Sequence, residues 1–170
     1  MIYKLESMLK IQSGLNEVIQ TTQNISRDTT RIQSHLCIMI ELMELCNSTR
    51  CFNYWSMKKR QDDADVLEEF SDVLCFLLTE LLELNINEID FNDAIKQENN
   101  LELTIRFQDL VKLYNELNYK DTNTYKLFSE KYFELGYALG YNIEMIFDAY
   151  KKKIDKNYSV QKQFKDGGNK

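Results

Sequence analysis

Proline is absent from all 170 residues of the chain, and glycine occurs only five times. Proline breaks helices and glycine weakens them, so a chain almost free of both favours long, uninterrupted helices. Apolar residues recur at helical spacing, and 44% of the residues are hydrophobic, which suffices for a packed core in a chain of this length. The sequence therefore predicts an all-α bundle of five or six helices that forms one domain over residues 1–170.

Punctuating residues help to place the helices along the chain. Ser26 or Asp28 suits the start of the second helix, and Gly136 or Gly140 suits the end of the fifth. Residues 160–170, which include Gly167, are expected to form a mobile tail. The periodic pattern places the helices at about 3–23, 26–45, 62–84, 101–117, 124–139 and 142–158.

Charge and cysteine usage exclude several classes of partner. A net charge of −6 argues against nonspecific nucleic-acid binding, which needs a basic face. The longest apolar region, 66–84, carries five acids, too many for a membrane span, and the first residues do not resemble a signal peptide. The single histidine, His35, and four cysteines without a C-x-x-C pair do not form a zinc ligand set. We expect a cytoplasmic protein that acts on a small molecule.

Two of the expected helices carry acids inside otherwise apolar runs. The run 36–46, LCIMIELMELC, is apolar nearly all round except at Glu41 and Glu44, and the run 66–78 repeats the pattern with Glu69 and Asp72. Residues three apart share one helical face, so each pair can direct its carboxylates to a common point. Because a helix that is apolar all round is normally buried, the four acids are expected in or beside the core.

Buried carboxylates are costly unless they are paired, protonated or bound to a cation. No lysine or arginine lies within 36–45 or 66–84 to pair with these acids. Oxygen ligands suit Mg²⁺, or Mn²⁺, and such ions in turn bind phosphates, so the pattern predicts a magnesium site for phosphate chemistry. The alternative is a solvated acidic stripe, because a single E-x-x-E is common in helical proteins.

The acids lie within longer motifs that resemble the all-α NTP pyrophosphatases, the superfamily that includes MazG, and especially their dimeric dUTPase branch. Residues 41–56, ELMELCNSTRCFNYWS, are similar to E-L-x-E-L-x-N-E-x-R-x-F-K-x-W-S, and residues 69–72, EFSD, match the E-x-x-D that follows. Residues 9–16, LKIQSGLN, resemble L-x-x-Q-x-x-L-[DN], and residues 149–161, AYKKKIDKNYSVQ, resemble A-Y-x-K-K-N-x-x-N-x-x-R-Q. No part of residues 86–122 carries the resemblance.

The resemblance implies a homodimeric hydrolase of dUTP, and of dUDP, that produces dUMP with release of pyrophosphate or phosphate. It implies that both acid pairs hold magnesium on the triphosphate and that Glu41 or Glu44 also activates the attacking water. The substrate contacts that it implies fall on Gln12, Asn16, Trp55, Lys153, Asn157 and Lys165. Without the resemblance, Trp55 would be interpreted as a core or interface anchor, Gln12 and Asn16 as surface residues, and Lys153 as part of a solvated basic run near a helix C-terminus.

Three positions depart from the pattern of this branch. Asn53 replaces a lysine, Cys75 replaces a common histidine and Val160 replaces an arginine. Valine cannot make the paired hydrogen bonds of arginine to phosphate. Two further interpretations therefore stay open: a pyrophosphatase of the same fold for another nucleotide such as dCTP, and a catalytically weakened helical dimer that binds a partner protein.

Overall fold

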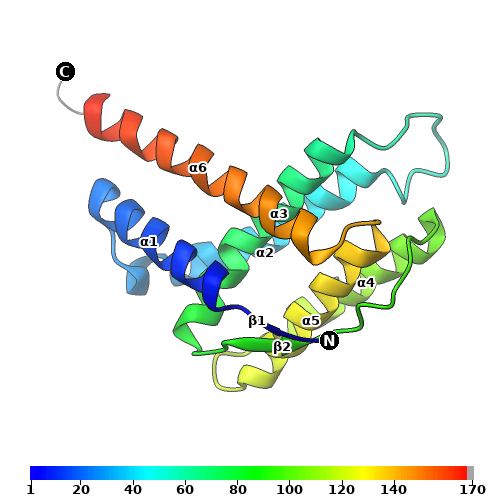
Figure 1. Cartoon of the computed structure of the whole chain (residues 1–170), viewed down its shortest axis with the longest axis horizontal. Helices are drawn as coiled ribbons and strands as arrows, with labels where there is room; N and C mark the ends of the chain where they lie inside the picture. Colours follow the sequence, from blue (N-terminus) through cyan, green and yellow to red (C-terminus); the bar gives the residue numbers. More distant parts are fainter. Residues whose placement is uncertain (168–170) are drawn as a thin grey trace.

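The computed structural model describes residues 1–167, which form six helices around a shared core, so the predicted all-α class is confirmed (Figure 1). Most helix ends lie within a few residues of the predicted positions. The helices are α1 (Glu6–Gln23), α2 (Arg27–Thr49), α3 (Asp63–Glu83), α4 (Asn100–Glu116), α5 (Thr122–Ala138) and α6 (Ile143–Gly167).

A short antiparallel ribbon joins the start of the chain to the segment after α3, where the sequence pattern predicted no strand. Its strands are β1 (Ile2–Lys4) and β2 (Glu88–Asp90). The ring of Tyr3 packs against Phe91 and Phe133, so aromatic contacts hold the ribbon on α5. The first helix therefore begins at Glu6, after the ribbon, and not at Tyr3.

Helix α3 lies at the centre of the bundle. It packs against α1, α2, α5 and α6, and its apolar residues are buried on nearly all sides, as expected for a helix that is apolar all round. Figure 1 shows the long α6 crossing over α3, with α1 on one side and the α4–α5 pair at the other end. Side chains of α3 are thus within reach of several helices at once.

The connection between α5 and α6 turns at Gly140, whose φ is 98°. This left-handed conformation favours glycine, so Gly140 is the residue that ends the fifth helix. Gly136 instead lies inside α5, where a Cβ would come 2.7 Å from the Ile146 side chain and 3.1 Å from the Phe70 ring. Helices α3, α5 and α6 therefore approach closely at Gly136.

Helix α6 is longer than the sequence pattern predicts, because it continues past Tyr158 to Gly167. Residues 159–165 contain lysines and glutamines, which favour helix, but their two large apolar residues, Val160 and Phe164, are exposed. Residues 159–165 therefore show no buried apolar face, although they are helical. The predicted tail is thus helical through residue 167, and its last part, 168–170, lies outside the described residues.

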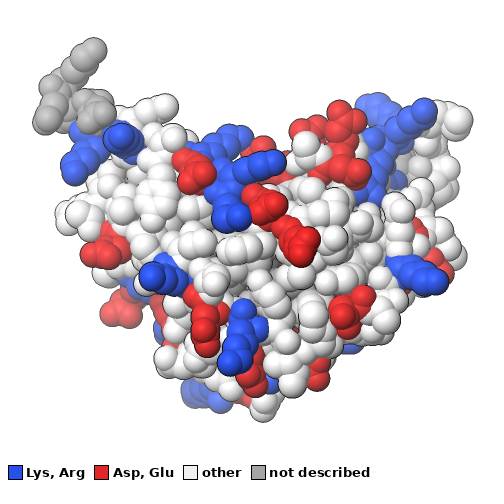
Figure 2. Space-filling view, viewed as in Figure 1, with Lys and Arg blue, Asp and Glu red and all other residues white. Residues whose placement is uncertain are grey.

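Within residues 1–167, no helix is long and apolar enough to cross a membrane. The four cysteines are free, with Cys51 and Cys75 buried and Cys37 and Cys46 partly buried. On the face shown in Figure 2, basic and acidic side chains are interspersed, with a group of basic ones over the middle of α6.

Candidate active site

Acids from both predicted pairs meet between α2 and α3. Glu41 comes from α2, Glu69 and Asp72 come from one face of α3, and one oxygen of each lies within 4.8 Å of the others. The two helices pack along each other, and a spacing of three residues keeps Glu69 and Asp72 on the same side of α3. All three side chains are partly buried, so they form a compact anionic group at the edge of the core.

Glu44, the fourth predicted ligand, is exposed and lies outside this three-oxygen group. Its charge nevertheless acts on the group. After burial and the charge of Asp72, Glu44 is the next cause of the raised pKa of both Glu41 and Glu69. Glu44 therefore lies near the group without completing it in this conformation.

The three oxygens fit a small, hard cation. Two ligands on opposite sides of Mg²⁺, each at about 2.1 Å, are about 4.2 Å apart. The acid oxygens lie within a similar spread of 4.8 Å, so small movements would bring them into coordination. Carboxylate oxygens are also the ligands that Mg²⁺ and Mn²⁺ prefer.

Burial and mutual repulsion both act on the pKa values of the acids in this group. Burial raises the pKa of Glu41 to about 7, and the charges of Asp72 and Glu44 add to the effect. Burial is also the largest cause of the raised pKa of Glu69 and of Asp72. The ionised carboxylates are thus incompletely hydrated and repel one another, and a cation among them would relieve both penalties.

Helix α6 supplies the cation that lies beside these acids, because the two arginines of α2 pair instead with Glu80 and Glu83. Lys153 Nζ lies 2.6 Å from Asp72 Oδ2 and 3.2 Å from Glu68 Oε1. Burial acts to lower the pKa of Lys153, but its bonds to the two acids outweigh burial and raise it. The acids therefore do have a basic partner, which the pattern of their own helices could not reveal because it comes from a distant part of the chain.

A cavity of about 390 Å³ opens beside the acids, between α1, α2, α3 and α6. This volume falls within the range of about 300–1,000 Å³ typical of small-molecule sites. Glu41 and Asp72 form part of its wall, so the cavity and the anionic group are continuous. Three predicted substrate residues, Gln12, Asn16 and Asn157, also line it.

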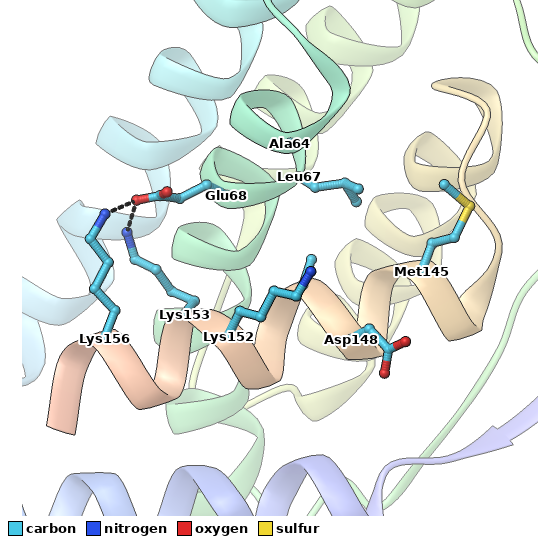
Figure 3. Close-up of a pocket in the computed structure, with 9 residues that line it drawn as sticks. Ala64, Leu67, Glu68, Met145, Asp148, Lys152, Lys153 and Lys156 are labelled. Atoms are coloured by element: carbon cyan, nitrogen blue, oxygen red, sulfur yellow. Dashed lines mark hydrogen bonds and ion pairs between the residues drawn. The ribbon is translucent and has the colours of Figure 1, made fainter. Parts of the chain in front are cut away.

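A groove of about 460 Å³ lies on the other side of Lys153, between the first turns of α3 and the middle of α6 (Figure 3). Lys152, Lys153 and Lys156 line it from α6. Glu68 accepts hydrogen bonds from Lys153 and Lys156, drawn as dashed lines in Figure 3. An anion extending from the cavity across the acids would therefore meet a row of ammonium groups.

Two predicted substrate residues lie away from the cavity. Trp55 is 67% exposed in the segment between α2 and α3, where its ring contacts Phe52 and Tyr54. Lys165 lies near the end of α6 and lines a separate hollow with Val18. Contact of either residue with a ligand in the cavity would require its segment to move.

Of the three departures from the family pattern, Cys75 changes the cavity wall. Burial raises its pKa to about 12, so the side chain stays a thiol and provides neither a cation nor a base. Asn157 Nδ2 lies 3.9 Å from its sulfur. Asn53 and Val160 do not line this cavity, and Val160 is exposed.

Several residues of the cavity wall were not singled out from the sequence. Cys37 precedes Glu41 by four positions and Phe76 follows Asp72 by four, so each lies one helical turn from an acid on the same face. That spacing was the available signal. Thr79 and Arg27 gave no comparable signal, because their positions depend on contacts between helices.

Carboxylates from two packed helices, a neighbouring lysine and a cavity of small-molecule size lie together, an arrangement that suits metal-assisted chemistry on a phosphorylated small molecule. The family model described as dUTPase matches residues 4–164, a span that includes the region 86–122 where no motif was recognised. The chain therefore belongs to the dUTPase family, and it is a hydrolase of the dUTP diphosphatase type. A comparison with individually curated proteins gives no match.

The raised pKa of Glu41 makes the metal-free protein sensitive to pH. A carboxyl with a folded pKa of about 7 and an ordinary value of 4.5 favours folding below 4.5, and this advantage is lost as the pH rises through 7. At pH 8 without metal, Glu41→Gln should therefore stabilise the fold by about 1–2 kcal/mol, after allowance for solvent screening. Thermal unfolding with a chelator at pH 5 and pH 8 measures this.

The gain should fall to about a quarter at pH 5, and Glu116→Gln, at an exposed acid of α4, should show no gain at either pH. A Glu41→Gln variant that unfolds at a lower temperature than the parent at pH 8 would contradict the proposed repulsion.

Proposed function

We propose that this protein hydrolyses dUTP to dUMP and pyrophosphate with Mg²⁺, or with Mn²⁺ in its place, and that it also releases phosphate from dUDP. The observation that carries the proposal is the continuity of the acid group, Lys153 and the cavity. The nucleoside would occupy the cavity, and its phosphates would extend across the acids towards the lysines of the groove.

Magnesium bound to Glu41, Glu44, Glu69 and Asp72 would neutralise the charge of the triphosphate. Glu41 or Glu44 would accept the proton of the attacking water as the P–O bond between dUMP and pyrophosphate breaks. Lys153 and Asn157, four apart on α6, would donate to phosphate and sugar oxygens. Gln12 and Asn16 would bind the edge of the base, and Trp55 and Lys165 would close over the substrate.

A panel of NTPs, dNTPs and dUDP, incubated with the purified protein in magnesium and in chelator, tests the proposal by the pyrophosphate or phosphate released. Fastest magnesium-dependent release from dUTP supports it. If another nucleotide releases pyrophosphate fastest, that nucleotide and not dUTP would be the preferred substrate. Release from none of them would contradict an enzymatic role and favour the protein-binding module.

One observation favours the second candidate, hydrolysis of another nucleotide such as dCTP. Cys75 stands in the cavity wall where the related pattern has a histidine, so the wall lacks a hydrogen-bonding ring there. The same nucleotide panel separates the two candidates.

We also propose that the protein forms a homodimer through an apolar stripe on α2, in the cytoplasm. Ile32, Leu36, Ile40 and Met43 are 84%, 54%, 45% and 39% exposed, and their spacing places them on one side of the helix. Exposed apolar side chains in a continuous stripe are typical of protein interfaces. A second copy of the chain could pair the same stripe with itself about a two-fold axis.

Leu36→Glu places a charge in the middle of the stripe, so we expect it to convert the dimer to monomer over a concentration range where the parent stays dimeric. Light scattering coupled to gel filtration measures the change in mass. Val160→Glu, at an exposed apolar position of α6, is the matched control and should leave the dimer intact. A Leu36→Glu protein that remains dimeric would place the interface elsewhere.

A further inference from the structure

A chain of hydrogen bonds links α6, α1 and α3 along one wall of the cavity. The Tyr150 hydroxyl donates to Gln12 Oε1 at 3.0 Å, and Gln12 Nε2 donates to Asn16 Oδ1 at 2.8 Å. The Thr79 hydroxyl approaches the same Asn16 oxygen at 3.1 Å. Gln12 is 2% exposed and Tyr150 is fully buried, so water has little access to this end of the chain of bonds.

The bonds decide which atoms of the two amides remain available to a ligand. Asn16 Oδ1 lies within hydrogen-bond distance of two donors, Gln12 Nε2 and the Thr79 hydroxyl, and when both donate to it they use the two lone pairs of the amide oxygen. Among the described residues, Asn16 Nδ2 takes part in no hydrogen bond. With Gln12 and Thr79 both donating to its oxygen, the amide of Asn16 offers the cavity N–H groups and not an oxygen.

Two hydroxyl groups decide which atoms donate and which accept in this series of hydrogen bonds, because each hydroxyl has one proton and two acceptors within reach. Thr79 can donate to Asn16 Oδ1 or, at 2.8 Å, to the carbonyl oxygen of Cys75. Tyr150 can donate to Gln12 Oε1 or, at 3.2 Å, to the carbonyl oxygen of Met8. If both protons turned to the backbone, both amides would have to rotate, and Asn16 would present its oxygen to the cavity.

We propose that Thr79 is a positioning residue that sets base selectivity by holding the Asn16 amide with its N–H groups towards the cavity. An N–H donor pairs with a carbonyl oxygen and repels an exocyclic amine. Uracil carries a carbonyl oxygen at the ring position where cytosine carries an amine. The site thus selects uracil over cytosine through a hydroxyl that itself need not touch the base, and this inference rests on the proposed binding of a nucleotide in the cavity.

The affinities of dUMP and dCMP, measured by calorimetry without turnover, test this role. Thr79→Val keeps the shape of the side chain but removes the donor, so the Asn16 amide is free to rotate and the preference for dUMP should fall about tenfold. Thr79→Ser restores the hydroxyl and should restore the preference. Thr104→Val is the matched control, because Thr104 lies in α4, outside the wall of this cavity, and its hydroxyl donates to the backbone of its own helix.

Tyr150→Phe removes the hydroxyl at the other end of this series of hydrogen bonds, and it should also reduce the preference for dUMP. An unchanged ratio of dUMP to dCMP affinity in Thr79→Val, or a parent protein that binds neither nucleotide, would overturn the inference. Turnover of dUTP by the parent is scored separately. Turnover with an unchanged ratio in Thr79→Val defeats only the role of Thr79, whereas a reduced ratio without turnover defeats only the proposed reaction.

Discussion

Asp72→Asn is expected to lower magnesium-dependent turnover of dUTP by a factor on the order of a thousand. Asp72 belongs to the three-oxygen group, lines the cavity and holds Lys153, so its charge serves all three parts of the proposed site. Asparagine keeps the shape of the side chain but removes that charge. Steady-state kinetics at saturating magnesium, together with magnesium titration by calorimetry, would show a loss of both turnover and metal affinity.

Asp65→Asn, at an exposed acid in the first turn of α3, is the matched control and should behave like the parent. Retention of turnover within about tenfold in Asp72→Asn would show that the acid group is not the active site.

The second large effect concerns stability and a buried carboxylate that the site does not use. Glu80 on α3 is completely buried, and one of its oxygens accepts hydrogen bonds from Arg27 and from Ser34, at 3.1 Å for the latter. Its other oxygen has no hydrogen-bond partner among the described residues. Arg27→Met would leave this charge without its cation, which typically costs about 3–5 kcal/mol. Thermal unfolding should then shift down by roughly 10 °C.

Arg31→Met is the control, because Arg31 is 41% exposed and its ion pair within residues 1–167 is with the partly exposed Glu83. This substitution should lower the free energy of unfolding by less than about 1 kcal/mol. The double variant Arg27→Met with Glu80→Leu removes both charges and should recover most of the loss. A single Arg27→Met variant as stable as the parent would mean that Glu80 does not depend on this ion pair.

The parts of the site that could be predicted from sequence are those set by spacing within one helix. Glu69 and Asp72 share a face of α3 because they are three residues apart, and Glu41 lies on the α2 face opposite them. The absence of proline and the apolar periodicity likewise gave the helical class. These features depend on the geometry of a single helix, which can be predicted from the spacing of residues in the sequence.

The parts that could not be predicted depend on which helices become neighbours. Lys153 pairs with Asp72 across 81 positions, and Thr79 reaches Asn16 across 63. Nothing in the periodicity of α1, α3 or α6 alone specifies those contacts. The ribbon formed by β1 and β2 was missed for the same reason, since each strand is only three residues long and is held in place by aromatic residues elsewhere in the chain.

The ion pair between Lys153 and Asp72 has a further consequence for the proposed metal binding. The ammonium group is tethered to the chain, so its effective concentration beside the acids is fixed by the fold and does not depend on the magnesium in solution. A divalent ion bound as proposed would compete with Lys153 for Asp72, and the displaced ammonium group would then be free to pair with phosphate oxygens.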